Sequence, residues 1–583
     1  MNSEQGSPGA GVHRPAGVSV LYDVAVPMAD GVRLSADIYL PSDVDGPYPA
    51  VLYRTPYNGQ MEYLIDRANF FAQNGYAVVC QDVRGRYDSE GEFRRWVNEF
   101  DDGHATVEWV GSQPWCDGNV GMSGPSYLGY VQWQAASMGS RYLKCIVPKV
   151  MGGDLHEAPH YQGGAFQLGV NATWSFRTDA RTMQHIDDYD WERLMHTLPV
   201  RDIPAAAGKV IADFTDWVDN PDFGEYWIDR NVLHRLEGVR VPALQIGGWY
   251  DLYPASTLNL FNGMRERGGT AEARANQRTI MGPWIHSASN MTVAGDVDFG
   301  TASQLELREV ELAWFDRWLK GIENRADREP PLRIFVMGIN RWRDEDRWPL
   351  ERTEYTPFYL HSGGGANSAA GDGLLSGMAP GPDGGDVGSH PAAPSDSFTY
   401  DPMFPVPTRG GGNCCDPHLV PWGAYDQREI EARSDVLVYT TEPLQHDLEV
   451  TGPVVLKLFA STDCRDTDFT AKLVDVFPDG RAINLTDGIL RGRYRNGTDR
   501  QELLVPGEIY EFTVDLWVTS NVFRAGHRIR LDVSSSNFPR FDRNPNTGNP
   551  FGLDAELRTA HQTVYHDDTR PSRLILPVIP AGP

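Results

Sequence analysis

The sequence contains no apolar run that approaches the roughly 20 residues of a membrane-spanning helix. Its first twenty residues also lack the apolar core of a signal peptide, and we expect residues 1–17 to form a disordered tail. These absences predict a cytoplasmic protein that does not engage membranes.

An excess of basic residues is also missing. The chain has 52 Lys and Arg against 79 Asp and Glu, which gives a formal charge of −27 over 583 residues. Such a surface repels phosphate backbones, so we expect no nucleic-acid partner. An apolar fraction of 41% is normal for globular proteins, and the length predicts three or four structural units.

Cysteine is too scarce for a disulfide scaffold, with six residues in the whole chain. Cys80 and Cys145 lie in apolar, strand-like runs and are predicted to be buried thiols. Cys414 and Cys415 are adjacent in a Gly-rich loop, where a disulfide and a reactive thiol both remain open. The chain has no HExxH motif and no convincing Cys/His cluster, so we predict no metal site.

The pattern of strands and helices divides the chain into four parts after the tail. Strands alternate with helices over residues 18–150 and again over 241–352, which predicts an α/β fold with a parallel sheet covered on both faces. Between them, residues 151–240 are mostly helical and predict a cap inserted between sheet strands. Period-two segments over 353–583 predict a β-sandwich or jelly roll.

Two local patterns support finer predictions. Ser303 and Glu306 match a capping box at the start of a helix expected over residues 303–321. The stretch from Ser362 to Pro394 is dominated by Gly, Ala, Ser and Pro, which is typical of a long loop.

The segment NVGMSGPSYLGYVQWQAASMG predicts a nucleophile. A short strand runs into Ser126 and a helix follows at once, which is the nucleophile-elbow arrangement. Gly124 and Gly129 supply small residues on either side, although the spacing is G-x-S-x-x-G rather than G-x-S-x-G. Ser123 is a weaker candidate because it lies inside the predicted strand.

A serine hydroxyl needs a histidine base, which a carboxylate in turn orients. Asp251 follows the predicted strand PALQIGG, and His286 follows the predicted strand RTIMG. The chain order Ser, Asp, His is that of α/β-hydrolases, and a shared sheet would bring all three residues to one edge.

Acyl transfer also needs donors for the developing oxyanion. The backbone N–H of Tyr127, directly after the candidate nucleophile, is the natural first donor. Pro56 has no N–H to offer from the loop after an early strand, so the hydroxyl of Tyr57 is the preferred second donor.

Several long motifs resemble the cocaine-esterase-type hydrolases of the CocE/NonD group, which are related to X-Pro dipeptidyl-peptidases and α-amino-acid ester hydrolases. The similarity covers most of the chain from about residue 18. The N-terminal motifs that carry it are RTPY (54–57), QDVRGRYDSEGEF (81–93), DGNVGMSGPSYLGYVQWQAA (117–136), GGWYD (247–251) and GPWIH (282–286). Those of the C-terminal part are DQREIEARSDVLVYTTEPL, DFTAKLVDVFPDGRAINL and AGHRIRLDVSSSNFPRFDRNPNTG.

The resemblance implies an α/β-hydrolase domain with an inserted helical cap and a C-terminal β jelly-roll domain. By position it implies a triad of Ser126, Asp251 and His286, with Tyr57 and the Tyr127 N–H as the oxyanion hole. It also implies that neither a metal nor an organic cofactor takes part.

Departures from the family pattern bear on specificity. Leu252, Tyr253 and Pro254 follow Asp251, so the carboxylates that relatives use to bind a free α-amino group are absent here. Two cap residues, His160 and Trp174, are candidates for the substrate pocket. Trp174 matches a cap tryptophan of the family, whereas His160 stands where the cocaine-cleaving enzyme carries a tryptophan. His160 either lines the acyl pocket or is a surface residue of the cap.

Three functional hypotheses follow. The first is a serine esterase that cleaves carboxylic esters through an acyl-enzyme. The second uses the same triad as an X-Pro dipeptidyl-peptidase or amide acylase, and the third is a binding protein without catalysis. The expected partner is a small-molecule ester or amide, and a homo-oligomer remains open.

Overall fold

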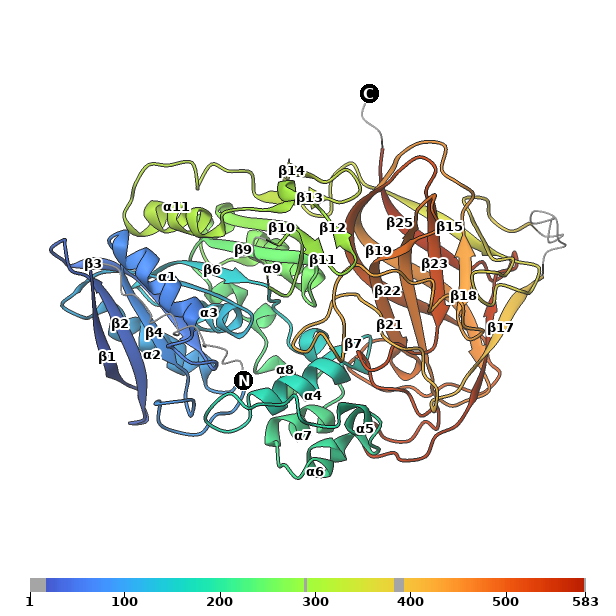
Figure 1. The fold of residues 1–583 in the computed structure, drawn as a ribbon, viewed down its shortest axis with the longest axis horizontal. Helices are drawn as coiled ribbons and strands as arrows, with labels where there is room; N and C mark the ends of the chain where they lie inside the picture. Colours follow the sequence, from blue (N-terminus) through green and yellow to red (C-terminus); the bar gives the residue numbers. More distant parts are fainter. Residues whose placement is uncertain (1–16, 288–290, 382–392, 581–583) are drawn as a thin grey trace, which may run out of the picture.

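The structure is a computed structural model, and it describes residues 17–287, 291–381 and 393–580. Residues 1–16, which make up nearly all of the predicted disordered tail, lie outside the described residues. Figure 1 shows two large bodies side by side, a mixed α/β body on the left and a β-rich body on the right.

A ten-stranded sheet forms the frame of the α/β body. Its seven central strands pair in parallel, in the order β4, β3, β5, β6, β9, β10, β13, while β1, β2 and β14 add antiparallel edges. The predicted parallel sheet is therefore confirmed. The strand bounds are β1 Val18–Pro27, β2 Arg33–Pro41, β3 Tyr48–Thr55, β4 Ala77–Asp82, β5 Cys116–Pro125, β6 Leu143–Lys149, β9 Ala243–Tyr250, β10 Gln277–Ile285, β13 Leu332–Val336 and β14 Arg341–Glu345.

Helices cover both faces of this sheet (Figure 1). On one face α1 and α11 pack together, with the rings of Phe71 and Phe315 5.4 Å apart. The central strands are buried along nearly their whole length, as expected for a parallel sheet between two helix layers. The helix bounds are α1 Glu62–Gln73, α2 Glu99–Gly111, α3 Tyr127–Ser137, α9 Pro254–Arg267, α10 Ala271–Ala275 and α11 Leu307–Leu319.

The predicted helical cap lies between β6 and β9, which are neighbours in the sheet. The whole segment is therefore an insertion, and Figure 1 shows it below the contact of the two bodies. It is mainly helical, as predicted, with one short hairpin. Its elements are β7 Tyr161–Gln162, β8 Ala165–Phe166, α4 Leu168–Arg177, α5 Trp191–Met195, α6 Ile203–Ala206, α7 Ala212–Asp219 and α8 Glu225–Ile228.

The C-terminal body is a second, eleven-stranded sheet system. Its strands pair antiparallel apart from the single contact of β16 with β18 within the described chain. Its bounds are β15 Glu354–His361, β16 Leu374–Ser376, β17 Ser395–Tyr400, β18 Leu437–Thr440, β19 Leu448–Thr462, β20 Asp468–Val476, β21 Ala482–Arg491, β22 Tyr510–Phe523, β23 Arg528–Ser534, β24 Ala560–Tyr565 and β25 Arg573–Ile579.

Two detailed predictions were wrong. Helix α11 begins at Leu307 rather than at residue 303, because Ser303 sits in a separate 3₁₀ turn and its hydroxyl donates to the Gly300 carbonyl instead of capping the helix. The loop expected from Ser362 to Pro394 contains the short strand β16. The part of that loop from 382 to 392 lies outside the described residues.

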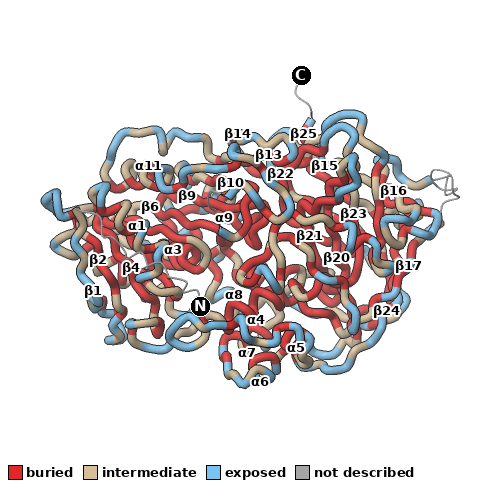
Figure 2. Tube along the Cα trace, viewed as in Figure 1, coloured by how far each residue is buried: buried red, intermediate tan, exposed pale blue. Residues whose placement is uncertain are grey.

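The apolar core is continuous across the contact of the two bodies (Figure 2). Residues of β9, β10 and β13, such as Trp249, Met281 and Phe335, belong to the same buried cluster as the inner strands of the C-terminal sheet. The backbone N–H of Met337 also donates to Ser520 O, which joins the two sheets. The C-terminal body therefore supports the strand ends from which Asp251 and His286 emerge.

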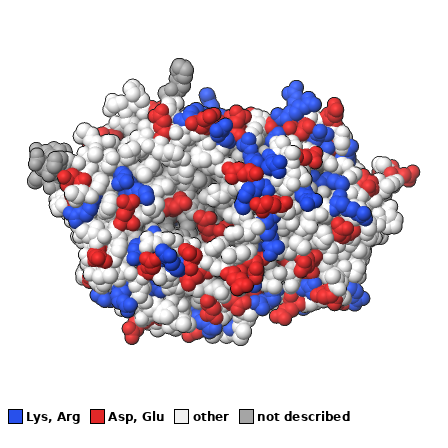
Figure 3. Space-filling model, turned by 180° about the vertical axis from the view of Figure 1, so that it is seen from behind, with Lys and Arg blue, Asp and Glu red and all other residues white. Residues whose placement is uncertain are grey.

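Charged side chains of both signs are interspersed over the face shown in Figure 3. No helix of the described chain has the length and apolar character that crossing a bilayer requires. Cys80 and Cys145 are buried and unpaired, as predicted, whereas Cys414 and Cys415 form a disulfide.

Candidate active site

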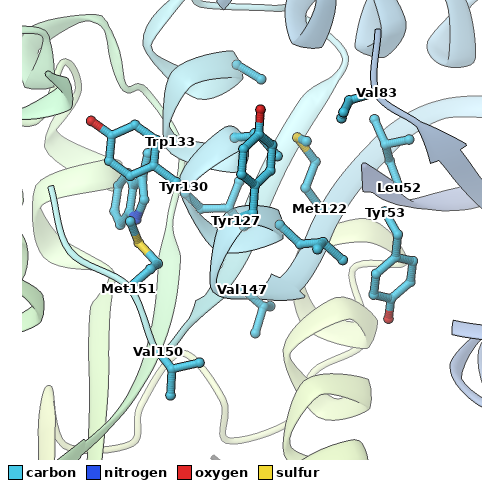
Figure 4. Packing of buried hydrophobic residues seen from close by; sticks show 14 of the residues in the cluster. Leu52, Tyr53, Val83, Met122, Tyr127, Tyr130, Trp133, Val147, Val150 and Met151 are labelled. Atoms are coloured by element: carbon cyan, nitrogen blue, oxygen red, sulfur yellow. The ribbon is translucent and has the colours of Figure 1, made fainter. Parts of the chain in front are cut away.

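Ser126 occupies a sharp turn between β5 and α3. Its backbone has φ 57° and ψ −123°, a conformation that costs free energy for a residue with a side chain. The turn is held because the Ser126 N–H donates to Lys149 O at 2.8 Å and its carbonyl accepts from Gly129 and Tyr130. Met122 of β5, Val147 of β6 and Trp133 of α3 belong to one buried apolar cluster, part of which Figure 4 shows.

The two glycines of the motif permit this close packing. A Cβ on Gly124 would lie 2.4 Å from the Cβ of Leu128, and one on Gly129 would lie 3.0 Å from Lys149 O. Gly129, three residues after Ser126, therefore serves as the small residue beside the neighbouring strand. The one-residue departure from G-x-S-x-G leaves the elbow intact.

Asp251 and His286 lie directly after β9 and β10, which are parallel neighbours. The Nδ1 atom of His286 is 2.7 Å from Asp251 Oδ1, and its Nε2 atom is 3.0 Å from Ser126 Oγ. The side chain of Asp251 is fully buried, while that of His286 is 14% exposed. The three residues predicted from the sequence are thus brought together in a hydrogen-bonded chain.

The hydrogen bonds fix the direction in which a proton can move. An ionised Asp251 accepts from Nδ1–H, and this leaves Nε2 as the acceptor for the Ser126 hydroxyl proton. Asp251 Oδ1 also accepts from the N–H of Leu252 at 2.7 Å, which holds the carboxylate in place. The imidazole is therefore oriented from both sides, by the carboxylate and by the serine.

Tyr57 and Trp174 lie beside the nucleophile. The Nε1–H of Trp174 donates to the Tyr57 hydroxyl oxygen at 3.1 Å, so the Tyr57 proton is free to point elsewhere. That hydroxyl also contacts Ser126, and burial raises the pKa of Tyr57 and keeps it protonated. The Tyr127 N–H belongs to the first turn of α3, where backbone donors have no partner within the helix. Two donors thus flank Ser126.

His160 lies inside the cap rather than on its surface. Its side chain is fully buried, with Nδ1 2.5 Å from Asn171 Oδ1 and its ring centroid 4.2 Å from that of Trp217. Burial lowers the pKa of His160 to about 3, so the ring is neutral. The alternative of a surface residue was wrong, and a role in the acyl pocket stays a prediction.

Two family models and a curated relative match this chain. A family model described as X-Pro dipeptidyl-peptidase (S15 family) matches residues 30–288, and one for the C-terminal non-catalytic domain of X-Pro dipeptidyl-peptidases matches residues 324–575. The cocaine esterase of Rhodococcus sp. (strain MB1 Bresler) is 42% identical over 96% of this chain and 99% of its own. The chain belongs to the CocE/NonD family of serine hydrolases.

Solved structures extend the same relationship. An α-amino-acid ester hydrolase superposes on this serine hydrolase with a TM-score of 0.85 and 27% identity over 98% of both chains. An aminopeptidase from a marine sediment archaeon (Thaumarchaeota) has the same TM-score with 26% identity over 99% of both chains. The α/β-hydrolase fold with a sheet-rich C-terminal domain is confirmed by these matches.

The sequence alone does not identify two residues of this serine hydrolase that hold Tyr57 and Tyr127, the predicted oxyanion donors, in place. Arg86 is fully buried and donates to Pro56 O at 2.8 Å and to Thr178 O at 2.9 Å, joining the Tyr57 loop to the cap. The Tyr127 hydroxyl donates to Glu99 at 2.7 Å. Arg86 lies within the motif QDVRGRYDSEGEF, but a buried arginine bound only to carbonyls leaves no recognisable pattern in a sequence.

The rival candidate Ser123 lies inside β5, as predicted, and its hydroxyl donates to the buried Glu311 at 2.8 Å. Burial opposes ionisation of Glu311, but Lys149 and Arg67 hold its pKa below the usual value. Ser123 is therefore part of a buried ion-pair network beneath the elbow. It has no histidine base among the contacts of the described residues.

The described residues include no group of three or more His, Cys, Asp or Glu side chains arranged to hold a metal ion. In the loop FDRNPNTGNP, Asp542 pairs with the buried Arg491 at 2.9 Å. This aspartate therefore takes part in a structural ion pair.

Proposed function

We propose that this serine hydrolase cleaves carboxylic esters, with Ser126 as nucleophile, His286 as general base and Asp251 as the residue that orients the histidine. The observation that carries the proposal is the continuous contact from Asp251 Oδ1 through both ring nitrogens of His286 to Ser126 Oγ. The 42% identity to a cocaine esterase supports ester hydrolysis over the rest of the family's reactions.

In the proposed mechanism, His286 Nε2 takes the Ser126 proton as Oγ attacks the ester carbonyl carbon. The tetrahedral oxyanion accepts hydrogen bonds from the Tyr57 hydroxyl and the Tyr127 N–H. His286 then returns its proton to the departing alkoxide, which leaves the acyl group on Ser126. Water deprotonated by His286 attacks this acyl-enzyme, and the acid is released in a second passage through the same steps.

The strained turn contributes to this chemistry. Because the structure around Ser126 holds it at φ 57°, Oγ projects from the end of β5 towards His286 rather than into the helix. No rearrangement of the serine is needed before attack, and preorganisation of this kind lowers the barrier.

The proposal is tested by replacing the two serines of the elbow separately. We expect Ser126→Ala to lower kcat on a p-nitrophenyl ester by about 10⁴-fold or more, because no other group can form the acyl-enzyme. Ser123→Ala is the matched control, since Ser123 lies three residues away but donates to Glu311. Near-normal turnover by the Ser126 variant would refute the assignment.

A second candidate uses the same residues on an amide, as an X-Pro dipeptidyl-peptidase or acylase. The S15 family match and the aminopeptidase structure favour it. It would need a group to bind the substrate's amine, and Leu252, Tyr253 and Pro254 provide no carboxylate behind Asp251. Comparison of kcat/KM for Xaa-Pro-anilides and short-chain esters decides, and a clear preference for the anilide would favour the peptidase.

We further propose the division into an α/β-hydrolase domain (18–150 and 241–352), a cap (151–240) and a jelly roll (353–583), together with action in the cytoplasm. The position of the cap between β6 and β9 supports the first part. Limited proteolysis and cell fractionation test the two parts. The hypothesis of a binding protein without catalysis is not retained, since the chain belongs to a family of serine hydrolases.

A further inference from the structure

The Cys414–Cys415 disulfide lies in a loop that crosses the chain at Asp251. A Cβ on Gly412 would be 2.3 Å from the carbonyl oxygen of Asp251, so the loop passes directly over the backbone of that residue. The Asn413 side chain donates to Gly410 O at 3.0 Å and to Pro421 O at 2.9 Å, which closes the loop on itself.

The two cysteines belong to an apolar cluster beside the proposed triad. Cys414 is buried in an apolar cluster that includes Leu252, Tyr253 and Val170, and Cys415 packs on the rim of the same cluster. The ring centroid of Tyr253 is 5.8 Å from that of His286. The cluster that contains the disulfide therefore extends, through Tyr253, to the ring of the histidine.

Helix α4 of the cap contacts both the Tyr57 side chain and the cluster around Cys414. Val170 and Trp174 are four residues apart on α4 and share one face of that helix. Trp174 binds the Tyr57 hydroxyl, while Val170 packs with Cys414. The apolar cluster around Cys414 therefore contacts both Tyr253, which lies beside His286, and helix α4, which carries Trp174.

We propose that the Cys414–Cys415 disulfide forms part of the wall of the substrate space beside Ser126, and that its oxidation state sets which esters the enzyme accepts. This inference rests on the proposed ester hydrolysis. Cys415 has φ 80°, in the left-handed region that non-glycine residues adopt only uncommonly. Once the bridge is reduced, the loop can relax away from Leu252 and Tyr253, and bulkier acyl groups fit.

The reduction requires a dithiol as reductant. One of its thiolates attacks the sulfur of Cys415, which is half-buried, and displaces the Cys414 thiolate. The second reductant thiolate then attacks the mixed disulfide, releases the Cys415 thiolate and closes the reductant's own disulfide. Two electrons pass to the protein, and the two cysteine thiolates each take up one proton that the dithiol gave up.

The test uses the full-length enzyme before and after native treatment with dithiothreitol, with iodoacetamide alkylation and mass mapping to count released thiols. We expect two new alkylation sites, at Cys414 and Cys415. We also expect the ratio of kcat/KM for p-nitrophenyl hexanoate to that for the acetate to rise about five-fold on reduction, because pocket shape mainly discriminates acyl size. Treatment of the reduced enzyme with oxidised glutathione should remove the two new alkylation sites and return the hexanoate-to-acetate ratio to its starting value.

Two variants separate this effect from other consequences of the reductant. The double variant Cys414→Ser/Cys415→Ser should show the raised ratio without reductant and should not respond to it. Cys464→Ala removes a buried, unpaired cysteine and should respond like the wild type. If circular dichroism shows that the double variant does not fold, the change in the kcat/KM ratio of the wild type on reduction tests the inference by itself.

Some outcomes would overturn the inference. Failure of dithiothreitol to release thiols in the folded enzyme would refute a reducible bridge. Release of both thiols with an unchanged hexanoate-to-acetate ratio would make the bridge a purely structural one. An oxidised enzyme that hydrolyses no ester would overturn the proposed function and this inference together, whereas ester hydrolysis with an unchanged ratio would overturn the inference alone.

Discussion

Within the described residues, one set of Ser, His and Asp lies at the end of the α/β sheet and another lies inside the C-terminal sheet. In the first, His286 uses one ring nitrogen for Asp251 and the other for Ser126. In the second, Nε2 of His566 faces both Ser362, at 3.1 Å, and Asp396, at 2.9 Å. The same residue types therefore form a proton relay in one place and a closed cluster in the other.

The two sets also differ in how far their side chains are exposed to solvent. His286 retains an opening to the outside at 14% exposure, whereas the side chains of His566 and Asp396 are 2% and 0% exposed. Ser362 donates to Asp396 at 2.7 Å, so its proton is already bound by the carboxylate. A substrate could not reach this serine, and the histidine could not activate it. We conclude that geometry and access distinguish the proposed catalytic triad from the buried network of Ser362, Asp396 and His566.

The largest difference between the two sets is expected in kcat, when Asp251 and Asp396 are each changed to asparagine. Asp251→Asn should lower kcat by about 10⁴-fold, because an amide no longer selects the tautomer that leaves Nε2 as an acceptor. Asp396→Asn, the matched control, should change kcat less than about two-fold, since it contacts no reacting atom. Comparable kcat losses in the two folded variants, measured on a p-nitrophenyl ester, would contradict the distinction.

A smaller effect is expected at the oxyanion side. Tyr57→Phe keeps the ring but removes the hydroxyl, and we expect kcat to fall about 10²-fold while KM changes little. Steady-state kinetics on a short-chain ester measure both constants. If KM rose and kcat did not change, Tyr57 would be a substrate-binding residue instead of an oxyanion donor.

The smallest effect concerns stability. Burial opposes ionisation of Asp396, but hydrogen bonds from His566, Ala366 and Ser362 outweigh it and hold its pKa below the usual value. The contribution to stability is therefore complete above the unfolded-state pKa of about 4 and is lost as the pH falls through the folded-state pKa. Asp396→Asn should cost about 1 to 3 kcal/mol at pH 7 and less below pH 4.

Urea unfolding of the wild type and the Asp396→Asn variant at several pH values between neutral and about pH 3.5 checks this last prediction. The two stability curves should converge towards acid pH. A constant difference across the range would mean that the charge of Asp396 contributes nothing, and that the asparagine affects only packing.

The sequence predicts that the first set of residues lies together, because each stands at a position that local rules identify. A strand, a turn and a helix enclose Ser126, and Asp251 and His286 each follow a strand of the same parallel sheet. Parallel strands align their carboxyl ends, so three distant residues meet without any further information. The order along the chain then selects the α/β-hydrolase arrangement from other triads.

Other features depend on contacts that no local pattern encodes. His160 is buried because Trp217, from another cap helix, covers it. Arg86 is positioned by carbonyls of two separate loops, and Ser303 bonds backward to Gly300 although its spacing to Glu306 fits a capping box. The network of Ser362, Asp396 and His566 joins residues that local sequence does not relate. These features require the tertiary structure.

We propose that, of these two sets, the one containing His286 carries the nucleophile. The most direct test of this proposal is labelling of the folded protein with a fluorophosphonate, followed by mass mapping of the adduct. We expect a single adduct on Ser126, which disappears in the Ser126→Ala variant and persists when Ser123 or Ser362 is replaced by alanine. Absence of labelling, or an adduct on any other serine, would contradict the proposal.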